Sequence, residues 1–368
     1  MSLSAARVSA GILLRGTRVL LSLRSADEEM PHTWQFPGGK VLQGENNKEA
    51  LGREIAEELG VTVVSAHLIG IEQHAFEAHT PIVIYFYVID SYEGHINALE
   101  KQALLWAEIG DVHNLDVLEP NRNVLQRMVD QTCFSSSHNT IWDSVWSTDT
   151  EEFSNPVVRT VRANEKLEIL KELGFKTKGG DKIGDIGGGS GEVSVLIEQH
   201  LTDNSFEIIC VDQSLVALKQ LQTKLLPGSC IEVFHSDARN IYVPNGFFDK
   251  IIALGVIEHL QQPKEFLQEL SRILKIDGQL FITQSNSYSM FYLDRVIREG
   301  IQNWPYGYQI NHTPGKLWSL VDEYFAVEKI FITLPGRDAP AYRMIDRLLH
   351  SLCSRWGRTI YLTARKIK

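Results

Sequence analysis

Cysteine is scarce in this sequence, and its spacing excludes two kinds of site. The cysteines stand far apart, without a C-x-x-C pair or histidines at zinc-ligand intervals: Cys133, Cys210, Cys230 and Cys353. This spacing argues against a structural zinc site and against a disulfide framework. We expect reduced and mostly buried thiols.

Long hydrophobic runs are also missing. No segment reaches the roughly 20 consecutive apolar residues that a membrane helix needs. The apolar stretch from Val8 to Leu23 is interrupted by Arg15 and Arg18, which argues against a signal peptide. We expect a cytoplasmic protein with no membrane partner, and nothing in the sequence indicates an obligate protein partner.

Positive charge is sparse in the first third of the chain. Before residue 133 there are 10 Lys and Arg against 18 Asp and Glu, whereas the remainder has 26 against 28. An acidic surface repels a nucleic-acid backbone and favours cations. We therefore expect no nucleic-acid polymer as a partner, while small metal-complexed nucleotides remain compatible with this charge.

The length of 368 residues and a change of pattern near the middle predict two α/β domains. Residues 1–132 alternate short β-rich runs with helices near 47–59 and 121–130. Residues 133–155 are rich in Ser and Thr and are predicted to be a linker with a short helix near 141–146. Residues 156–368 alternate strand and helix, which predicts a doubly wound parallel sheet.

Three glutamates are predicted to share one face of the helix at 47–59. Glu54, Glu57 and Glu58 stand at i, i+3 and i+4. Carboxylates this close repel one another unless a cation lies between them, and hard oxygen ligands suit Mg²⁺ or Mn²⁺. A solvated acidic helix face is the alternative. Upstream, Pro37 to Gly39 supplies a backbone that can approach a metal or phosphate closely.

The segment from 39 to 61 resembles the Nudix box, G-x5-E-x7-R-E-U-x-E-E-x-G-U. The match covers every defined position: Gly39, Glu45, Arg53, Glu54, Ile55, Glu57, Glu58, Gly60 and Val61. The resemblance implies an α/β/α sandwich with a mixed sheet. It also implies magnesium held by Glu54, Glu57, Glu58 and the Gly38 carbonyl, with Glu54 as general base and Arg53 positioning the glutamates or the phosphates.

The run from Trp34 to Lys40 and the run from Glu100 to Trp106 resemble the MutT-like branch, which hydrolyses nucleoside triphosphates to monophosphate and pyrophosphate. This resemblance implies four further site residues: Glu100 near the metal, Arg24 and Phe36 near the substrate, and Asn121 reading the base. The alternatives are a loop acid for Glu100, a surface charge for Arg24 and a helix N-cap for Asn121.

The base preference stays open between an oxidised purine and cytidine. Glu77 and Thr80 stand where the oxidised-guanine branch has an aromatic residue and an arginine. Relatives that share the W-x-F-P-G-G-K motif use cytidine nucleotides.

A glycine-rich run from Lys182 to Gly191 follows a predicted strand and precedes a predicted helix. Alone, it is compatible with NAD, FAD, S-adenosylmethionine or a tight loop. Acids at the ends of the next strands narrow the choice, because a carboxylate there can accept ribose hydroxyls or meet an adenine amine. These acids are Asp212 and Asp237, and each could instead cap a helix or turn.

The spacing from Asp185 through the glycines resembles motif I, D-x-G-x-G-x-G, of class I S-adenosylmethionine-dependent methyltransferases. The resemblance implies a Rossmann-like doubly wound sheet with S-adenosylmethionine bound at the strand ends. The implied cofactor residues are Asp185, Gly187, Gly189, Gly191, Asp212, Asp237, Ala238 and Leu254.

A small-molecule methyl acceptor is expected beneath the aromatic-rich segment 285–314, although aromatics at such spacings also form ordinary cores. His259 and His312 are the candidate bases. His259 could instead shape a pocket wall, and His312 precedes a predicted helix start. The leading hypothesis is a bifunctional enzyme. The alternatives are a Nudix domain that only senses nucleotide and regulates the methyltransferase, and a second domain that binds without catalysis.

Overall fold

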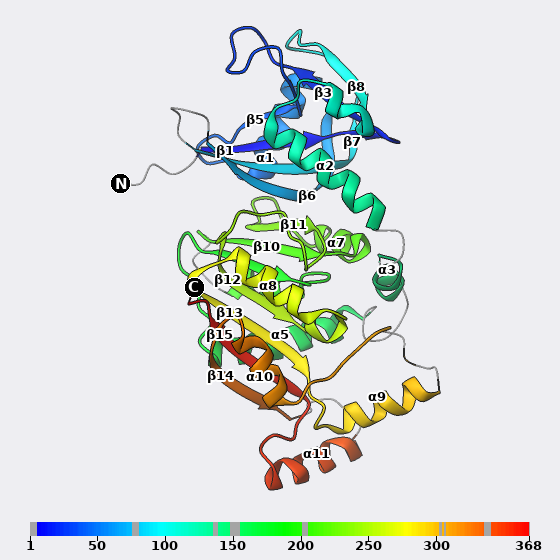
Figure 1. The fold of residues 1–368 in the computed structure, drawn as a ribbon, viewed down its shortest axis with the longest axis vertical. Helices are drawn as coiled ribbons and strands as arrows, with labels where there is room; N and C mark the ends of the chain where they lie inside the picture. Colours follow the sequence, from blue (N-terminus) through cyan, green and yellow to red (C-terminus); the bar gives the residue numbers. More distant parts are fainter. Residues whose placement is uncertain are drawn as a thin grey trace. The chain divides into compact units, whose positions relative to one another are not determined.

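The computed structural model describes residues 6–75, 81–134, 139–147, 155–200, 205–301, 304, 307–334 and 340–367 (Figure 1). Its contacts separate into two compact units. The first is Met1–His138 with Tyr242–Pro244, and the second is Asn139–Ile241 with Asn245–Lys368. Each unit has its own hydrophobic core.

A mixed sheet forms the centre of the first unit. In order across it, the strands are β6 (Thr62–His74), β7 (Ile82–Glu93), β1 (Ala6–Ile12) and β5 (Gly38–Lys40). β1 runs parallel to β7 and antiparallel to β5, and β6 runs antiparallel to β7. A smaller antiparallel sheet joins β3 (Arg18–Leu23) to β2 (Leu14–Arg15), β4 (Trp34–Gln35) and β8 (Leu104–Glu108).

Two helices cover opposite faces of the mixed sheet. Successive side chains of β1 point to opposite faces, so neighbouring residues of β1 show which helix lies on which face. Ala10 packs in a core shared with Leu125 of α2 (Glu119–Phe134). Gly11 faces the other way, toward Leu51 and Ile55 of α1 (Asn47–Leu59). The short 3₁₀ helix η1 (Ile109–Asn114) follows β8. The predicted α/β/α sandwich with a mixed sheet is confirmed.

The second unit contains a doubly wound sheet. In order across it, the strands are β14 (Ala326–Thr333), β15 (Thr359–Arg365), β13 (Leu274–Ser285), β12 (Phe248–Leu254), β9 (Lys182–Ile186), β10 (Glu207–Asp212) and β11 (Ile231–His235). From β13 to β11 the strands are parallel, as predicted. β15 runs antiparallel to both its neighbours, because the chain leaves the end of β14 and re-enters the sheet at the same edge.

Helices flank this sheet. They are α3 (Asn139–Ser147), α5 (Pro156–Glu172), α6 (Glu192–His200), α7 (Leu215–Gln222), α8 (Pro263–Ile273), α9 (Met290–Gly300), α10 (Pro314–Asp322) and α11 (Pro340–Leu352), with the 3₁₀ turn η2 (Ile257–His259) after β12. α5, α6 and α7 share one core with β9, β10 and β11, and α8 lies in front of the sheet in Figure 1. No described helix is long and apolar enough to cross a membrane.

The strand order indicates where a ligand would bind in the second unit. β9 lies between β10 and β12, so the winding of the chain reverses direction between β9 and β12. In open α/β sheets, ligands bind outside the carboxyl ends of the strands at such a switch point. The glycine run follows β9 directly, which places it in the crevice at this switch point.

Two candidate active sites

Helix α1 presents the acidic residues of the first candidate site, and its ends are fixed by local chemistry. Asn46 accepts a hydrogen bond from the backbone N–H of Glu49, whose side chain accepts one in return, which forms a capping box. Gly60 ends the helix in the left-handed conformation. The apolar side of α1 is buried, so its acidic side is fixed in direction.

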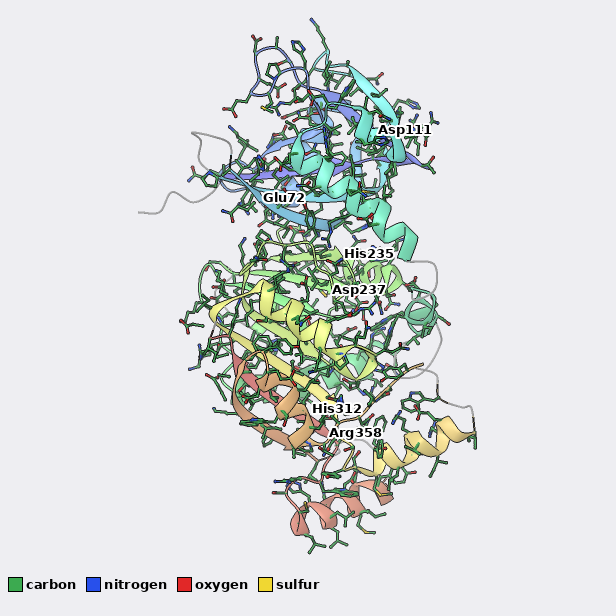
Figure 2. The ribbon with its side chains drawn as sticks, viewed as in Figure 1. Glu72, Asp111, His235, Asp237, His312 and Arg358 are labelled. Carbon is green, nitrogen blue, oxygen red and sulfur yellow. The ribbon has the colours of Figure 1, made fainter. Side chains whose placement is uncertain are left out.

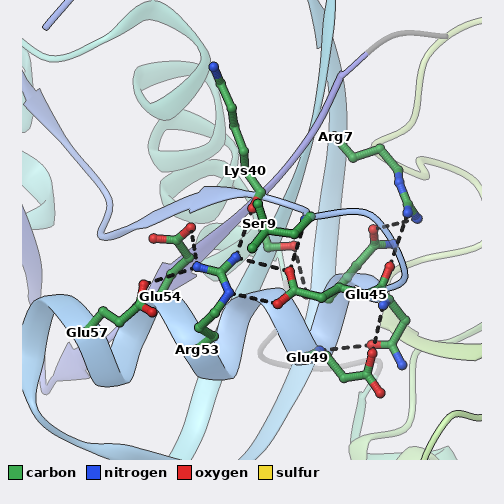
Figure 3. Close-up of polar contacts among 11 residues, drawn as sticks. Arg7, Ser9, Lys40, Glu45, Glu49, Arg53, Glu54 and Glu57 are labelled. Atoms are coloured by element: carbon green, nitrogen blue, oxygen red, sulfur yellow. Dashed lines mark hydrogen bonds and ion pairs between the residues drawn. The ribbon is translucent and has the colours of Figure 1, made fainter.

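Arg53 organises the acidic side of α1 (Figure 3). Its guanidinium donates to both carboxylate oxygens of Glu45, at 2.7 and 3.0 Å, and to Glu54 at 2.8 Å. It also donates to Glu57 at 3.1 Å and to the Lys40 carbonyl at 3.0 Å. Hydrogen bonding by Arg53 lowers the pKa of Glu45 to about 2. One arginine therefore links the loop before α1 to two of the predicted metal ligands.

Glu58 has a different environment, because its side chain is buried. Its carboxylate accepts a hydrogen bond from the Gly38 N–H at 3.0 Å. Burial, together with the negative charges of Glu100 and Glu54, raises the pKa of Glu58 to about 8. The structure thus brings Glu100 into the electrostatic range of Glu58. The Gln102 side chain, which donates to the Glu58 carbonyl at 3.1 Å, ties this loop to α1.

Two glycines let strand β5 approach the acidic cluster. Gly38 has a φ of +144°, and a Cβ there would collide with the Ser9 carbonyl oxygen. A Cβ on Gly39 would collide with the Glu54 carboxylate. Only residues without side chains fit here, so the backbone of β5 lies directly beside the carboxylates.

The donor set fits a divalent cation, although the carboxylates are held apart in this arrangement. Among the described residues, no three acidic, histidine or cysteine side chains are gathered as a ready-made metal cage. Glu54 and Glu57 point to Arg53, and Glu58 bonds to Gly38. A buried carboxyl surrounded by like charges is the environment that a hard cation with oxygen ligands stabilises.

The predicted substrate residues have distinct positions. Arg24 donates to the Gln35 side chain at 2.6 Å and to the Glu29 carbonyl at 2.7 Å. Phe36 is 2% exposed and packs edge-on against Phe86, so its ring supports the loop from within the core. In this position the ring has little exposed surface, because it lies in the hydrophobic core of the first unit.

Asn121 lies inside the first turn of α2, where its side chain is buried. It therefore does not occupy the N-cap position, because α2 begins at Glu119.

Glu77 and Thr80, which bear on the base preference, lie outside the described residues, as do parts of the predicted linker at 135–138 and 148–154. Sequence reasoning missed Glu28, whose charge also raises the pKa of Glu58; its position in a loop without a motif gave no signal.

The glycine run of the second unit forms a tight loop at the end of β9. Gly187, Gly189 and Gly191 all have φ between +58° and +70°, where L side chains are strained. The Gly187 N–H donates to the Val211 carbonyl at 2.7 Å, which fastens the loop to β10. A Cβ on Gly187 would collide with Val256, which lies just beyond β12. The predicted loop therefore joins the ends of three neighbouring strands.

Two of the predicted acids lie beside this loop. Asp185 is 3% exposed and accepts a hydrogen bond from the Ser194 hydroxyl at 2.6 Å. Asp212 accepts from the N–H groups of Gly189 and Ser214, both at 2.8 Å. Burial raises the pKa of each carboxyl to about 6. These bonds fix the Asp212 carboxylate at the end of β10, beside the glycine loop.

Asp237 follows β11, which ends at His235, and Figure 2 labels both residues. Its carboxylate is held by the Arg239 side chain at 2.6 Å and by the Arg239 backbone N–H at 2.8 Å. Ala238 and Leu254 are partly exposed, and Leu254 ends β12. The structure thus puts Asp185, Asp212, Asp237 and Leu254 at or just beyond the carboxyl ends of adjacent parallel strands.

His259 and His312 lie beyond β12 and β13. Burial lowers the pKa of both imidazoles. Nδ1 of His259 lies 3.2 Å from the Tyr308 carbonyl, which only accepts hydrogen bonds, so Nδ1 carries the proton and Nε2 is left to accept one. His312, labelled in Figure 2, bonds to the Gln284 side chain. Glu258 accepts from the Ser285 N–H at 3.2 Å, which ties η2 to the end of β13.

Family models match both parts of the chain. A NUDIX domain model matches residues 5–130, and a methyltransferase domain model matches residues 184–282. The 8-oxo-dGTP diphosphatase of Haemophilus influenzae is 31% identical over 34% of this chain and 93% of its own length. The CTP pyrophosphohydrolase of Escherichia coli is 32% identical over 27% of this chain and 73% of its own length. Among solved structures, the YcgJ protein from Bacillus subtilis matches with 14% identity and a TM-score of 0.42, over 56% of this chain and 99% of that one.

The comparisons agree with the two motifs that the sequence displays. The NUDIX model covers the segment that contains α1 and its carboxylates, and the methyltransferase model begins two residues after the start of β9 and ends within β13, at residue 282. The chain therefore belongs to the Nudix hydrolase family through its first domain and carries a methyltransferase domain in its second.

Proposed function

We propose that the chain is a bifunctional enzyme. Its first domain hydrolyses a nucleoside triphosphate to the monophosphate and pyrophosphate, and its second transfers a methyl group from S-adenosylmethionine to a small-molecule acceptor. The observation that carries the first activity is the Arg53 network, which holds Glu54 and Glu57 beside a buried Glu58. The observation that carries the second is the Asp212 carboxylate bonded to the glycine loop.

In the hydrolase site, Glu54 accepts the proton of the attacking water. Glu54, Glu57, Glu58, Glu100 and the Gly38 carbonyl would hold the metal, and Arg53 keeps Glu54 in place. Bound Mg²⁺ or Mn²⁺ would neutralise charge on the diphosphate and orient the water for in-line attack. Arg24 and Asn121 contact the substrate.

The nucleobase is an oxidised purine or cytosine. Relatives carrying both kinds of name support this pair of candidates: an 8-oxo-dGTP diphosphatase and a CTP pyrophosphohydrolase. The two candidates differ in size and in hydrogen-bonding edge, so a direct comparison of substrates separates them.

In the methyltransferase site, Asp212 accepts hydrogen bonds from the ribose hydroxyls and Asp237 meets the adenine amine. The sulfonium of S-adenosylmethionine supplies an activated methyl group, so catalysis consists mainly of aligning the acceptor with it. Nε2 of His259 takes the proton when the acceptor is an oxygen or nitrogen. The lowered pKa of His259 keeps this nitrogen unprotonated near neutral pH.

Pyrophosphate release tests the hydrolase. The full chain with Mg²⁺ is supplied with ordinary, oxidised and methylated nucleoside triphosphates. We expect turnover of one class, reduced on the order of 10²- to 10⁴-fold by Glu54→Gln because a general base is lost. Glu49→Gln makes the same change at the capping box of the same helix and should leave turnover unchanged. If no nucleotide is turned over but one binds, the Nudix domain is a nucleotide sensor that regulates the methyltransferase.

Consumption of the donor tests the second activity. The hydrolase product is the first acceptor to offer, together with methyl-labelled S-adenosylmethionine. Label in that product would connect the two activities. Donor binding without transfer to any acceptor, including a wide panel of small molecules, would favour the alternative of a second domain that binds without catalysis.

A further inference from the structure

Helix α3 lies within the segment between the two sequence motifs, and its contacts are with the second unit. The Ser214 hydroxyl donates to the Asp143 carboxylate at 2.6 Å, and the Val216 N–H approaches the same oxygen at 3.4 Å. The Gln220 side chain donates to the Trp146 carbonyl at 3.2 Å. α3 is thus fastened to α7, at its N-cap Ser214 and near its end at Gln220, and α7 follows Asp212 closely in the chain.

Trp146 covers the glycine loop. A Cβ placed on Gly189 would collide with the six-membered ring of the Trp146 indole. The Gly189 N–H is the group that donates to Asp212. The indole therefore lies beside the backbone that positions the carboxylate assigned to the ribose.

Trp142, one turn earlier, reaches the other side of the crevice. Its ring packs edge-on against the His259 imidazole, with centroids 4.9 Å apart and planes at 86°. Residues i and i+4 share a helix face. One face of α3 thus contacts both the donor loop and the candidate base.

α3 depends on these contacts for its order. It spans nine residues, and an isolated helix of that length is not stable in water. Val145 is 7% exposed, so the helix buries its apolar side against the second unit. A short helix with two tryptophans held at a ligand crevice is suited to enclosing that ligand.

We propose that α3 forms a wall of the donor site, in which Trp146 packs against bound S-adenosylmethionine on the ribose side and Asp143 holds the helix in place. This inference rests on the proposed use of S-adenosylmethionine. Trp146 is a binding residue, and Asp143 is a positioning residue that acts through α7. The matched methyltransferase model begins at residue 184, so this wall lies outside the segment that the family model describes.

Calorimetric titration with S-adenosylhomocysteine tests the proposal, using the full chain. We expect Trp146→Ala to weaken binding by tenfold or more. Trp318→Ala is the control, because Trp318 is a partly exposed tryptophan of the same domain on α10, and it should bind as the unaltered chain does. Asp143→Ala should weaken binding severalfold, and Asp143→Asn, which keeps an acceptor for Ser214, should restore it.

Each outcome decides between the hypotheses. If the unaltered chain does not bind S-adenosylhomocysteine, the proposed donor is wrong. If the unaltered chain binds and both tryptophan variants bind equally well, α3 is no part of the site. Circular dichroism and thermal melting establish that the variants are folded, and the Asp143 pair carries the test should Trp146→Ala fail to fold. Equal binding by Asp143→Ala and Asp143→Asn overturns the role of Asp143.

Discussion

The two candidate sites are built in opposite ways. In the first domain, one helix and the loop before it carry most of the predicted ligands, and a single arginine joins them. In the second, residues at the ends of several strands form the site, and helix α3, which lies outside the sheet, forms one of its walls. The first arrangement concentrates its function in one short segment, whereas the second distributes it over more than a hundred residues.

This difference predicts how each site responds to damage. A change at Arg53 should disturb several ligands together, because they share its guanidinium. A change at one strand end of the second domain should remove one contact and leave the others in place. The following predictions test this contrast, beginning with the largest effect.

Arg53→Lys should reduce hydrolysis on the order of 100-fold while donor binding is unchanged. Lysine keeps the charge but cannot bridge Glu45, Glu54 and the Lys40 carbonyl, and small displacements of catalytic groups reduce rates by about this factor. The measurement is kcat for pyrophosphate release. Arg122→Lys, on α2, makes the same change away from the cluster. Equal activity of the two variants would show that the network is dispensable.

Asp212→Asn should weaken S-adenosylhomocysteine binding roughly tenfold or more, because a charge-assisted acceptor is lost. The loss should be confined to the second domain, with hydrolysis intact. Asp249→Asn, whose residue lies at the start of β12 and bonds to Lys182, is the matched control. Similar losses in both variants would point to general destabilisation.

The same site should respond to pH. Asp212 has a pKa raised to about 6, so it is ionised above that pH and accepts ribose hydroxyls there. Donor affinity should therefore decline as pH falls from 7 to 5, and this decline should be smaller in Asp212→Asn. An identical pH profile in both proteins would place the titrating group elsewhere.

Asp185→Asn should raise the free energy of unfolding by roughly 2 kcal/mol at pH 7.5. Burial raises the pKa of Asp185 to about 6, above its value in the unfolded chain. The stability that the carboxyl contributes is therefore complete at low pH and is lost as pH rises through 6. Urea unfolding should show the gain of the amide at pH 7.5 and little gain at pH 4. A variant less stable at both values would contradict the assignment.

The sequence predicted more of the first site than of the second, for a physical reason. The spacing of Glu54, Glu57 and Glu58 on one helix is a local property, so it is visible without the fold. Asp185 and Asp212 were also visible, because each stands at the end of a strand in a regular alternation. Trp142, Asp143 and Trp146 carry no motif, and their place at the crevice depends on contacts with residues more than seventy positions away.

Buried positions were harder to interpret than spacing. Phe36 belongs to a motif that indicates substrate contact, yet its ring fills the core. Glu58 was identified as a metal ligand, but its burial and its bond to Gly38 are properties of the folded chain. A pattern of residue types indicates which groups assemble, whereas packing decides which of them reach solvent.

The position of α3 also limits where the chain can be divided. α2 ends at Phe134 and α3 begins at Asn139, so only a few residues separate the last helix of the first domain from the first helix of the second. A gene fragment that begins just before β9, where the methyltransferase motifs start, would encode the strands of the sheet without the α3 wall of the donor site. Anyone transplanting this second enzyme, or replacing the first with another protein, would have to make the cut ahead of Asn139.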